Sequence, residues 1–271
     1  MRYILTFLML GITQHILYAQ TTDFATGARS KGIGDASAAY SDVWAVFNNI
    51  GSLYGERDFT MAITYFTLHQ VEGFNGGAVC INLPHEKFNF GTGAFYFGDE
   101  FYKESRFTAG LSHKINFVSL GVSVNYLQYN ILEFGSSTSW VIEMGGLVEF
   151  TSKLHFGASI YNLNQAQLSE SQQQVPILMK AGLSFKPIDK LMMNLDLEKN
   201  QTLKANIKSG MEYQVIKQLM VRMGINTSPS TSHFGIGFLT HRGNIDYAIS
   251  NHFPLGLSHH VSANIKLNRK K

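Results

Sequence analysis

The sequence has little of what most soluble enzymes contain. Only one of its 271 residues is a cysteine, Cys80, so neither a disulfide framework nor a cysteine-based zinc site can form within the chain. Proline occurs five times, and charged residues make up 15% of the chain, against about 25% in typical soluble domains. The net charge is +3, with lysine and arginine scattered, so no basic patch predicts a nucleic-acid partner.

Long apolar runs are missing as well. After residue 20 no stretch approaches the roughly 18 apolar residues that a membrane-spanning helix needs. The first residues read differently, with a charge at Arg2, an apolar run over Tyr3–Ile12 and a small residue at Ala19. This pattern is typical of a secretory signal peptide, so we expect residues 1–19 to be cleaved and the rest to be exported.

Aromatic residues and glycine are abundant. Aromatic residues reach 13% of the chain, and there are 25 glycines. Few charges together with many aromatic residues and glycines favour a β-rich protein with an apolar exterior over a soluble α/β enzyme.

From Asp58 onward the apolar residues recur with a period of two, as in strands with two different faces. In Leu191–Lys199, for example, leucine and methionine alternate with Asn194, Asp196 and Glu198. We predict fourteen strands, near residues 58–68, 76–83, 88–97, 105–114, 117–128, 139–150, 153–161, 177–186, 191–199, 203–213, 218–226, 232–240, 244–250 and 258–268. Many are close to ten residues long, the length that a tilted strand needs to cross a bilayer.

The predicted connections favour a membrane barrel over a soluble β-sandwich. Connections after even-numbered strands are short, as at residues 115–116 and 151–152, and most connections after odd-numbered strands are longer, as at residues 162–176. Outer-membrane barrels have this asymmetry, with short periplasmic turns and longer outer loops. The connection near residues 200–202 is the exception, because it should be long and is short. We therefore predict a single antiparallel barrel over residues 57–271, in the cell outer membrane and in contact with its lipid.

The polar faces of the strands should point into this barrel. The predicted lumen-facing charges are Glu143, Asp196, Glu198, Lys204, Lys208, Glu212, Arg222 and Lys266. If the chain turns near residues 200–202, Glu198 faces Lys204 and Asn194 faces Lys208 across neighbouring strands. Both signs of charge are present, which indicates a structural ladder that fills the lumen more than a selective ion pathway.

Residues 20–56 lack strand alternation and are rich in glycine, alanine and serine. We expect this segment to fold into the barrel as a plug, with a short helix near Asp42–Asn48 that Ser41 could cap. Its bulky apolar residues Trp44, Val46 and Phe47 must be buried, and inward-facing apolar residues that could receive them are Met192, Met220 and Leu178. The glycine spacing does not fit a nucleotide-binding fingerprint.

This N-terminal segment resembles the signature of the FadL-like outer-membrane proteins grouped as PorV/PorQ in Bacteroidetes. The resemblance rests on Gly27-Ala28-Arg29, Gly32-Ile33-Gly34, Asp42-Val43-Trp44 and Asn48-Asn49-Ile50-Gly51, and the last hairpin, with Ile245-Asp246-Tyr247 and Leu255-Gly256, resembles the family's last hairpin too. The plug motif that it marks comprises Gly27, Arg29, Gly32, Gly34, Asp42, Trp44, Phe47, Asn48 and Gly51. Asn49-Ile50 stands where the family usually has Pro-Ala.

The resemblance implies two functions. PorV- and PorQ-like proteins serve type IX secretion, so our first expectation is a secretion-linked or structural scaffold whose partners are secretion-system proteins or secreted cargo. The alternative is FadL-like passive transport of a hydrophobic small molecule, which leaves sideways through the wall beside the N-terminal hatch.

No enzyme motif accompanies these features. The sequence has no Gly-x-Ser-x-Gly elbow, no His-Glu-x-x-His and no phosphate-binding loop, so we predict no catalytic residue and no cofactor. His259 and His260 are adjacent, so in a strand they point to opposite faces and cannot bind one metal ion together. We therefore expect His252, His259 and His260 to be ordinary histidines of the strand ends and loops.

Overall fold

The computed structural model describes residues 25–170, 172–201, 203–253 and 255–267, and the expected signal peptide lies outside them. Fourteen strands close into one antiparallel barrel, in which each strand pairs with its neighbours in sequence and β1 pairs with β14. The strands are β1 (Phe59–Thr67), β2 (Asn75–Pro84), β3 (Phe88–Gly98), β4 (Tyr102–Ile115), β5 (Val118–Ile131), β6 (Gly135–Glu149), β7 (Leu154–Tyr161), β8 (Leu178–Ile188), β9 (Leu191–Asn200), β10 (Asn206–Ile216), β11 (Leu219–Thr227), β12 (Ser230–Thr240), β13 (Gly243–His252) and β14 (Gly256–Leu267). The prediction of a fourteen-stranded barrel is confirmed.

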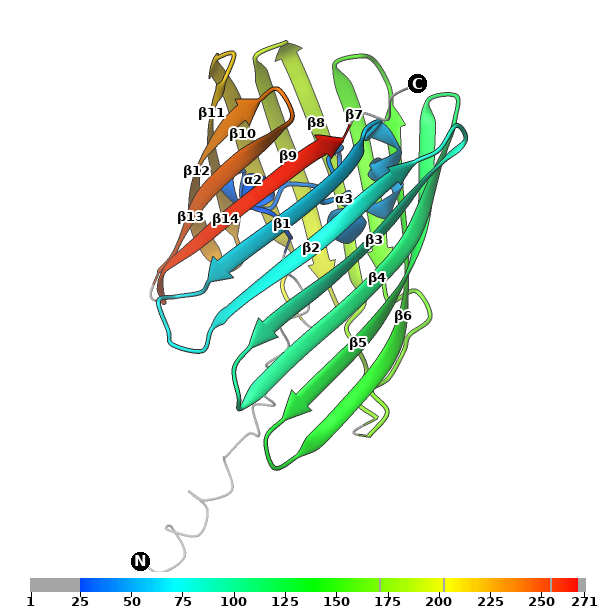
Figure 1. Cartoon of the computed structure of the whole chain (residues 1–271), viewed down its shortest axis with the longest axis vertical. Helices are drawn as coiled ribbons and strands as arrows, with labels where there is room; N and C mark the ends of the chain where they lie inside the picture. The colour runs from blue at the N-terminus through cyan, green and yellow to red at the C-terminus, as the bar shows by residue number, and fades with distance from the viewer. Residues whose placement is uncertain (1–24, 171, 202, 254, 268–271) are drawn as a thin grey trace, which may run out of the picture.

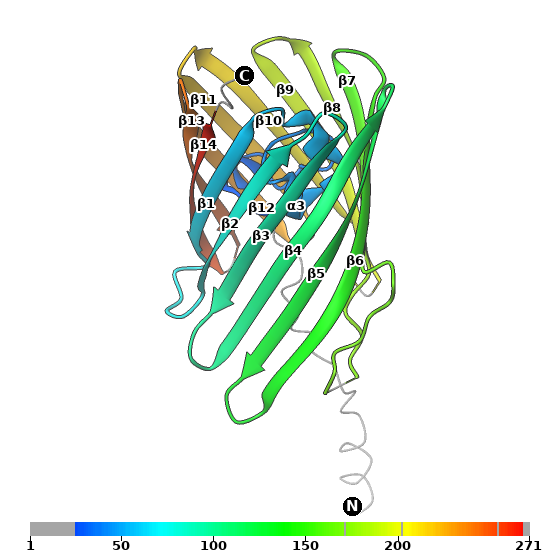
Figure 2. The ribbon, with the colours of Figure 1, turned by 45° about the vertical axis from the view of Figure 1, so that its right-hand side comes forward.

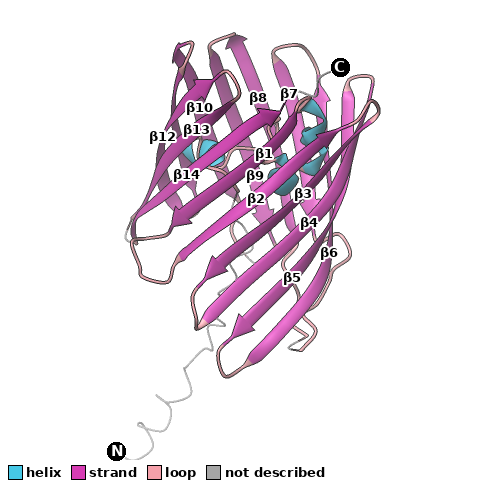
Figure 3. Ribbon diagram, viewed as in Figure 1, coloured by secondary structure: helices cyan, strands magenta, loops and turns pink. Residues whose placement is uncertain are grey.

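Three short helical elements precede the barrel in sequence and lie inside it. They are α2 (Ala28–Gly32), α3 (Ala45–Asn48) and the 3-10 helix η1 (Ile50–Gly55). Figure 1 shows this segment in blue within the ring of strands, and the view in Figure 2 agrees. The helices stand out in cyan against the magenta wall in Figure 3. We call residues 25–55 the plug.

The strands have the two faces that the sequence predicted. On β9, Leu195 is 51% exposed on the outside, whereas its neighbour Asn194 is 5% exposed on the inside. The same alternation on β6 exposes Trp140 and buries Val141 and Glu143. An apolar outer face is suited to lipid and a polar inner face to a lumen. In the part of the chain that the structure describes, no helix is long and apolar enough to cross a membrane.

The two ends of the barrel differ. The long-loop end carries the connections at residues 68–74 and 162–177, and the short-turn end carries tight turns such as residues 116–117. Two predicted loops, residues 98–104 and 129–138, are mostly strand instead, because β4, β5 and β6 continue beyond the apolar belt. The outward residues of this extension include Gln128, Asn130, Ser136 and Thr138. In β6 polar residues on both faces hid the period of two, and in β5 the alternation is reversed, with Tyr129 facing inward and Asn130 outward.

Candidate functional site

The plug spans the lumen from one wall to the other. α2 packs against β11, β12, β13 and β14, and η1 packs against β3, β4, β5 and β6. Nearly every residue from Ala25 to Leu53 is buried, including Trp44 at 1% exposed and Ile50 at 0%. The candidate functional site is therefore the contact between the plug and the inner wall, together with the lumen next to it.

Inward-facing glycines shape the wall to the plug. A Cβ atom added to Gly91 would lie 2.6 Å from a side-chain carbon of Leu53, and one added to Gly121 would lie 2.8 Å from the backbone nitrogen of Gly51. Similar close approaches to the plug occur at Gly93, Gly110, Gly145, Gly157, Gly210, Gly224 and Gly235. Side chains at these positions would prevent the plug from lying this close to the wall.

Polar side chains of the wall bind the backbone of the plug. Asn194 donates to the carbonyl of Ala36 at 3.0 Å, and the Asp196 carboxylate accepts from the Ala38 N–H at 2.8 Å. On the opposite wall, the Ser119 hydroxyl donates to the Gly51 carbonyl at 2.5 Å, and Asn89 donates to the Leu53 carbonyl at 3.0 Å. These bonds satisfy buried groups of a segment that has little secondary structure of its own. Sequence reasoning did not single out Asn89 or Ser119, although both lie on the inward face of a predicted strand.

A chain of buried charges joins the plug to β10, β11 and β13. Arg29 of the plug donates two hydrogen bonds to the Glu212 carboxylate, at 2.9 and 2.7 Å. Arg222 donates to the same carboxylate at 2.6 Å and to Asp246 at 2.7 Å. At the plug end, the Arg29 guanidinium lies 3.6 Å from the Asp42 carboxylate. Burial raises the pKa of the Asp42 carboxyl to about 6, against the opposing effect of Arg29.

Most of the other predicted lumen charges also have partners inside the barrel. Lys208 donates to Glu198 at 2.5 Å, and Glu143 is 4% exposed beside the Ser123 hydroxyl, which donates to it at 3.5 Å. Lys266 reaches Glu56, next to the plug, at 3.1 Å near the short-turn end.

Lys204 does not face the lumen, and its predicted pairing was wrong. β10 begins at Asn206, so Lys204 is an exposed residue of the connection at residues 201–205. Asn206 is opposite Glu198, and Lys208 is opposite Asp196. The turn is longer than the sequence suggested, and each predicted partner is displaced by two residues. A shift of two keeps every side chain on its face, which is why the inward assignment of Lys208 stands.

The plug-motif residues lie together in the lumen. Gly27 has a φ of +96°, which favours glycine, and a Cβ atom there would lie 2.5 Å from the Trp44 indole. Asn48 holds Thr26 by two hydrogen bonds, at 2.8 and 3.0 Å. Gly32 and Gly34 lie against the inward faces of β11 and β12, and Gly51 lies against β5 and β6.

The helix of the plug and the contacts of its apolar residues differ from the prediction. The helix α3 starts at Ala45 instead of Asp42. Just before it, the Asp42 carboxylate, and not the Ser41 hydroxyl, accepts a hydrogen bond of 2.9 Å from the Trp44 N–H. Trp44, Val46 and Phe47 do not pack on Met192, Met220 or Leu178. Their cluster includes Phe66, Ala78, Cys80, Phe95 and Phe97, on β1, β2 and β3. Met192 packs instead with Ile33 and Tyr40 of the plug, and Leu178 packs with Leu168 and Val175 of the loop at residues 162–177.

Toward the long-loop end two parts of the inner wall are apolar, and β4 places Glu104 and Arg106 between them. On one side lie Phe66, Phe95 and Phe97, with the Phe66 and Phe95 ring centres 6.0 Å apart. On the other side, a second buried cluster comprises Leu127, Tyr129, Val141, Tyr161 and Leu178 of the wall together with Leu168 and Val175 of the loop at residues 162–177. We call these two apolar faces the vestibule lining.

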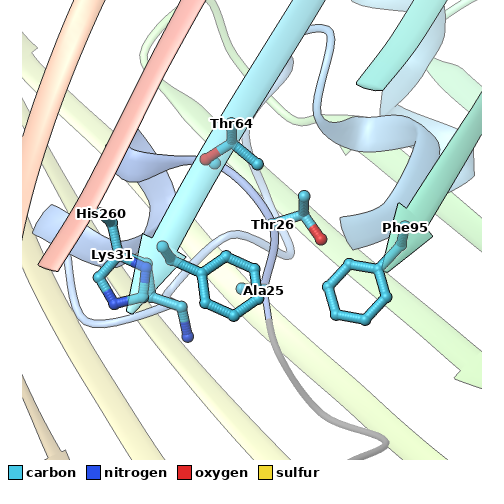
Figure 4. A pocket seen from close by; sticks show the side chains of 8 residues that line it. Ala25, Thr26, Lys31, Thr64, Phe95 and His260 are labelled. Carbon is cyan, nitrogen blue, oxygen red and sulfur yellow. The ribbon is translucent and has the colours of Figure 1, made fainter. Parts of the chain in front are cut away.

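A small cavity lies between the plug and the first of these faces. Figure 4 shows Lys31 and His260 at one side of it and Phe95 at the other, with Ala25 and Thr26 of the plug between them. Its volume is about 10 Å³, room for about one water molecule. The cavity is too small for an organic ligand, so a solute would have to displace part of the plug or a loop.

The wall is weakest where β7 ends. The β6–β7 ladder stops at the pair of Glu143 and Tyr161, whereas β6 continues outward to Gly135. The loop at residues 162–177 covers the free edge, and the side chain of Asn164 takes the place of a strand by accepting from the Ile142 N–H and donating to the Trp140 carbonyl, both at 2.9 Å. Farther out, Ser169 and Thr138 exchange two bonds of 3.0 Å. This part of the barrel is closed by a loop and not by a strand.

Comparisons with known proteins support the fold. No protein-family model matches the sequence, and no curated protein matches it. Among solved structures, the chain is similar to the toluene transporter TbuX of Ralstonia pickettii, with 14% identity, a TM-score of 0.70, and coverage of 90% of this chain and 99% of that one. It is also similar to the toluene transporter TodX of Pseudomonas putida (14% identity, TM-score 0.67, 89% and 97% covered) and to a FadL homologue of Pseudomonas aeruginosa (11% identity, TM-score 0.66, 90% and 99% covered). The chain thus has the fold of FadL-type hydrophobic channels.

Proposed function

We propose that this protein is an outer-membrane channel for the passive transport of hydrophobic small molecules. The observation that carries the proposal is the vestibule lining, two apolar faces at the long-loop end of a barrel whose other inward residues are largely polar. A porin for polar solutes would not need aromatic and aliphatic residues there. The similar solved structures named as toluene transporters support the same class of solute.

The route that we propose leads into the vestibule from outside the cell and then sideways through the loop-closed part of the wall. The plug blocks the direct path, because it is buried and fitted against inward glycines. The loop at residues 162–177 carries Leu168 and Val175 of the vestibule lining and also seals the edge of β6. Moving this one loop would connect the apolar lining to lipid near Trp140, which is 63% exposed on the outer face.

A reversible disulfide tests the route. Thr138 and Ser169 are joined by one backbone bond and by a bond from the Thr138 N–H to the Ser169 hydroxyl, so the two residues lie close enough to test with a pair of cysteines. We expect the variant with Thr138→Cys, Ser169→Cys and Cys80→Ala to take up radiolabelled toluene into cells when reduced and to stop when oxidised. The control pair Phe101→Cys and Leu132→Cys, joined by a 2.9 Å backbone bond at two hairpin tips, should transport in both states.

The two parts of the proposal fail separately. If cells that carry the wild-type protein take up toluene and a long-chain fatty acid no faster than cells without it, the transport function is wrong. If the oxidised Thr138–Ser169 pair transports as fast as the reduced one, only the lateral route is wrong.

A second proposal is the secretion-linked or structural scaffold of the PorV/PorQ type. It is favoured by the filled lumen and by the long hairpins of β3–β6, whose tips expose Phe101, Leu132 and Phe134 beyond a polar collar. Co-purification from detergent-solubilised outer membranes tests it: a stable secretion-system partner would support this function, and a protein that purifies alone while toluene uptake is measurable would contradict it.

A further inference from the structure

Two histidines from different loops meet where the barrel closes on itself. His69 follows β1, His252 ends β13, and β14 lies between these strands, paired with both. The loops that follow β1 and β13 lie side by side at the long-loop end (Figure 1). The two imidazole ring centres are 5.6 Å apart, with the rings at 76° to each other. His69 adopts a φ of +56°, and its N–H is held by the Ser258 hydroxyl oxygen at 3.0 Å.

Each of these rings has an unused nitrogen. The Nδ1 atoms of His69 and His252 are both buried without a hydrogen-bond partner. A neutral imidazole carries a lone pair on its unprotonated ring nitrogen, and this is the atom that binds a metal ion.

The separation fits a shared ion. With a metal about 2.1 Å from one nitrogen of each ring, two ring centres stand roughly 5 to 6 Å apart at tetrahedral or wider angles. The other described histidines of this end are engaged elsewhere: His260 points into the lumen, His259 is hydrogen-bonded to the Tyr247 hydroxyl at 2.8 Å, and His233 is hydrogen-bonded to the Ser250 hydroxyl at 2.8 Å. Within the described residues there is no group of three or more histidine, cysteine or acidic side chains, so water would complete the coordination.

We propose that His69 and His252 bind one divalent transition-metal ion, such as Zn²⁺, Ni²⁺ or Cu²⁺, which joins the loops after β1 and β13 across the closing seam of the barrel. Imidazole is a suitable ligand for all three ions. The site uses neither the plug nor the vestibule lining, so it goes beyond the transport proposal and does not depend on it. From the sequence we expected His252 to be an ordinary histidine like His259 and His260, because its neighbour His69 is far away in the chain; the proposal changes that expectation for His252.

Calorimetric titration of the full-length protein in detergent, purified without a polyhistidine tag, tests the site with Zn²⁺ and with Cu²⁺. We expect one ion per chain, and at least about a tenfold loss of affinity in His69→Ala and in His252→Ala. The control His85→Ala, at an exposed turn of the other end, should bind as the wild type does. Bound Cu²⁺ should show two nitrogen ligands by electron paramagnetic resonance.

Migration on unboiled gels shows whether each variant is a folded barrel, so a folding defect is distinguished from a lost ligand. The proposal would be overturned if the folded wild type binds neither ion. It would also be overturned if a folded variant with both His69→Ala and His252→Ala binds as the wild type does.

Discussion

Replacing Glu212 with alanine should loosen the plug without unfolding the barrel. The Glu212 carboxylate accepts two hydrogen bonds from Arg29 of the plug and one from Arg222 of the wall. In Glu212→Ala, Arg222 keeps Asp246 at 2.7 Å, but Arg29 keeps only the weaker contacts with Asp42, at 3.6 Å, and with the Tyr40 ring, at 4.7 Å. The positive charge of Arg29 would then lack a close carboxylate while the plug is in place, and it would be hydrated when the plug moves out. The change therefore favours the displaced plug.

The size of the effect follows from the burial of this pair. Removing one partner of a buried, hydrogen-bonded ion pair costs about 3–5 kcal/mol. Because Arg29 is 22% exposed and retains Asp42, the lower end of this range applies. A cost of about 3 kcal/mol multiplies the population of the displaced plug by roughly 100.

The single cysteine supplies the assay. Cys80 is 1% exposed, and its thiol lies 3.5 Å from the Val43 carbonyl of the plug, in the same cluster as Trp44. A maleimide can reach it only when the plug moves. When the plug moves out and back faster than the maleimide reacts, the labelling rate is proportional to the fraction of molecules with a displaced plug. Cys80 in Glu212→Ala should therefore react about 100-fold faster than in the wild type.

The matched control is Glu149→Ala. Glu149 accepts a 2.5 Å bond from Lys114, but this pair is partly exposed and is formed by two wall residues. Such pairs contribute about 0–1 kcal/mol, so labelling of Cys80 should change by less than about fivefold. If Glu212→Ala and Glu149→Ala label at equal rates, the buried charges do not hold the plug and our reasoning about the seal is refuted.

Three further predictions test the wall and the plug. Leu195→Arg should reduce barrel assembly, because a charge in lipid costs about 2–4 kcal/mol, and the fast-migrating band on unboiled gels should be lost. Asn194→Arg should assemble, but it should expose Cys80 to maleimide because Asn194 binds the backbone of the plug. Gly145→Ala should raise Cys80 labelling because its methyl group would overlap the Asn49 side chain, and Gly146→Ala, whose methyl group points toward Leu120 on the outside, should not; equal effects would contradict the close fit. The seated plug raises the pKa of Asp42 from its unfolded value of 3.8 to about 6. The contribution of Asp42 to stability is therefore greatest at low pH and falls as the pH rises from about 4 to 6. In Asp42→Asn, the temperature of the heat-induced gel shift should lose this part of its pH dependence.

The fold could be predicted from the sequence because each strand must present two chemically different faces. Leu195 and Asn194 show this directly: one side chain meets the outside and its neighbour meets the lumen, so a simple alternation carries the information. The pattern failed in the outer part of β6, where both faces are polar, and at the end of β5, where Tyr129 faces inward and Asn130 outward; there the sequence suggested loops. It also left the register of β9 and β10 uncertain, because a shift of two residues preserves every face and moves every cross-strand partner, including that of Glu198.

The fit of the plug could not be predicted in the same way. A glycine in a strand pattern, such as Gly121 or Gly157, indicates a close approach of something but does not say of what. The partners of these glycines are Gly51 and Ala38, which are distant in sequence and lie in a segment without a periodic pattern. The choice of wall for Trp44 was wrong for the same reason, since it depends on the path of the plug and not on the composition of any strand.

The lumen thus has two seals of different strength, and the difference favours movement of the loop over movement of the plug. The plug is held by hydrogen bonds to charged side chains, such as those from Arg29 to Glu212 and from the Ala38 N–H to Asp196, which contribute about 1.5–3 kcal/mol each, and by close contacts with glycines. The loop at residues 162–177 is held on β6 by neutral hydrogen bonds, such as that between Asn164 and Ile142, which contribute about 0.5–1.5 kcal/mol each. An apolar solute in the vestibule could also replace the contacts of Leu168 and Val175 with the wall, which lowers the cost of moving the loop further. No such replacement is open to the charges that hold the plug, so a hydrophobic compound would open the side of this barrel before it opens the centre.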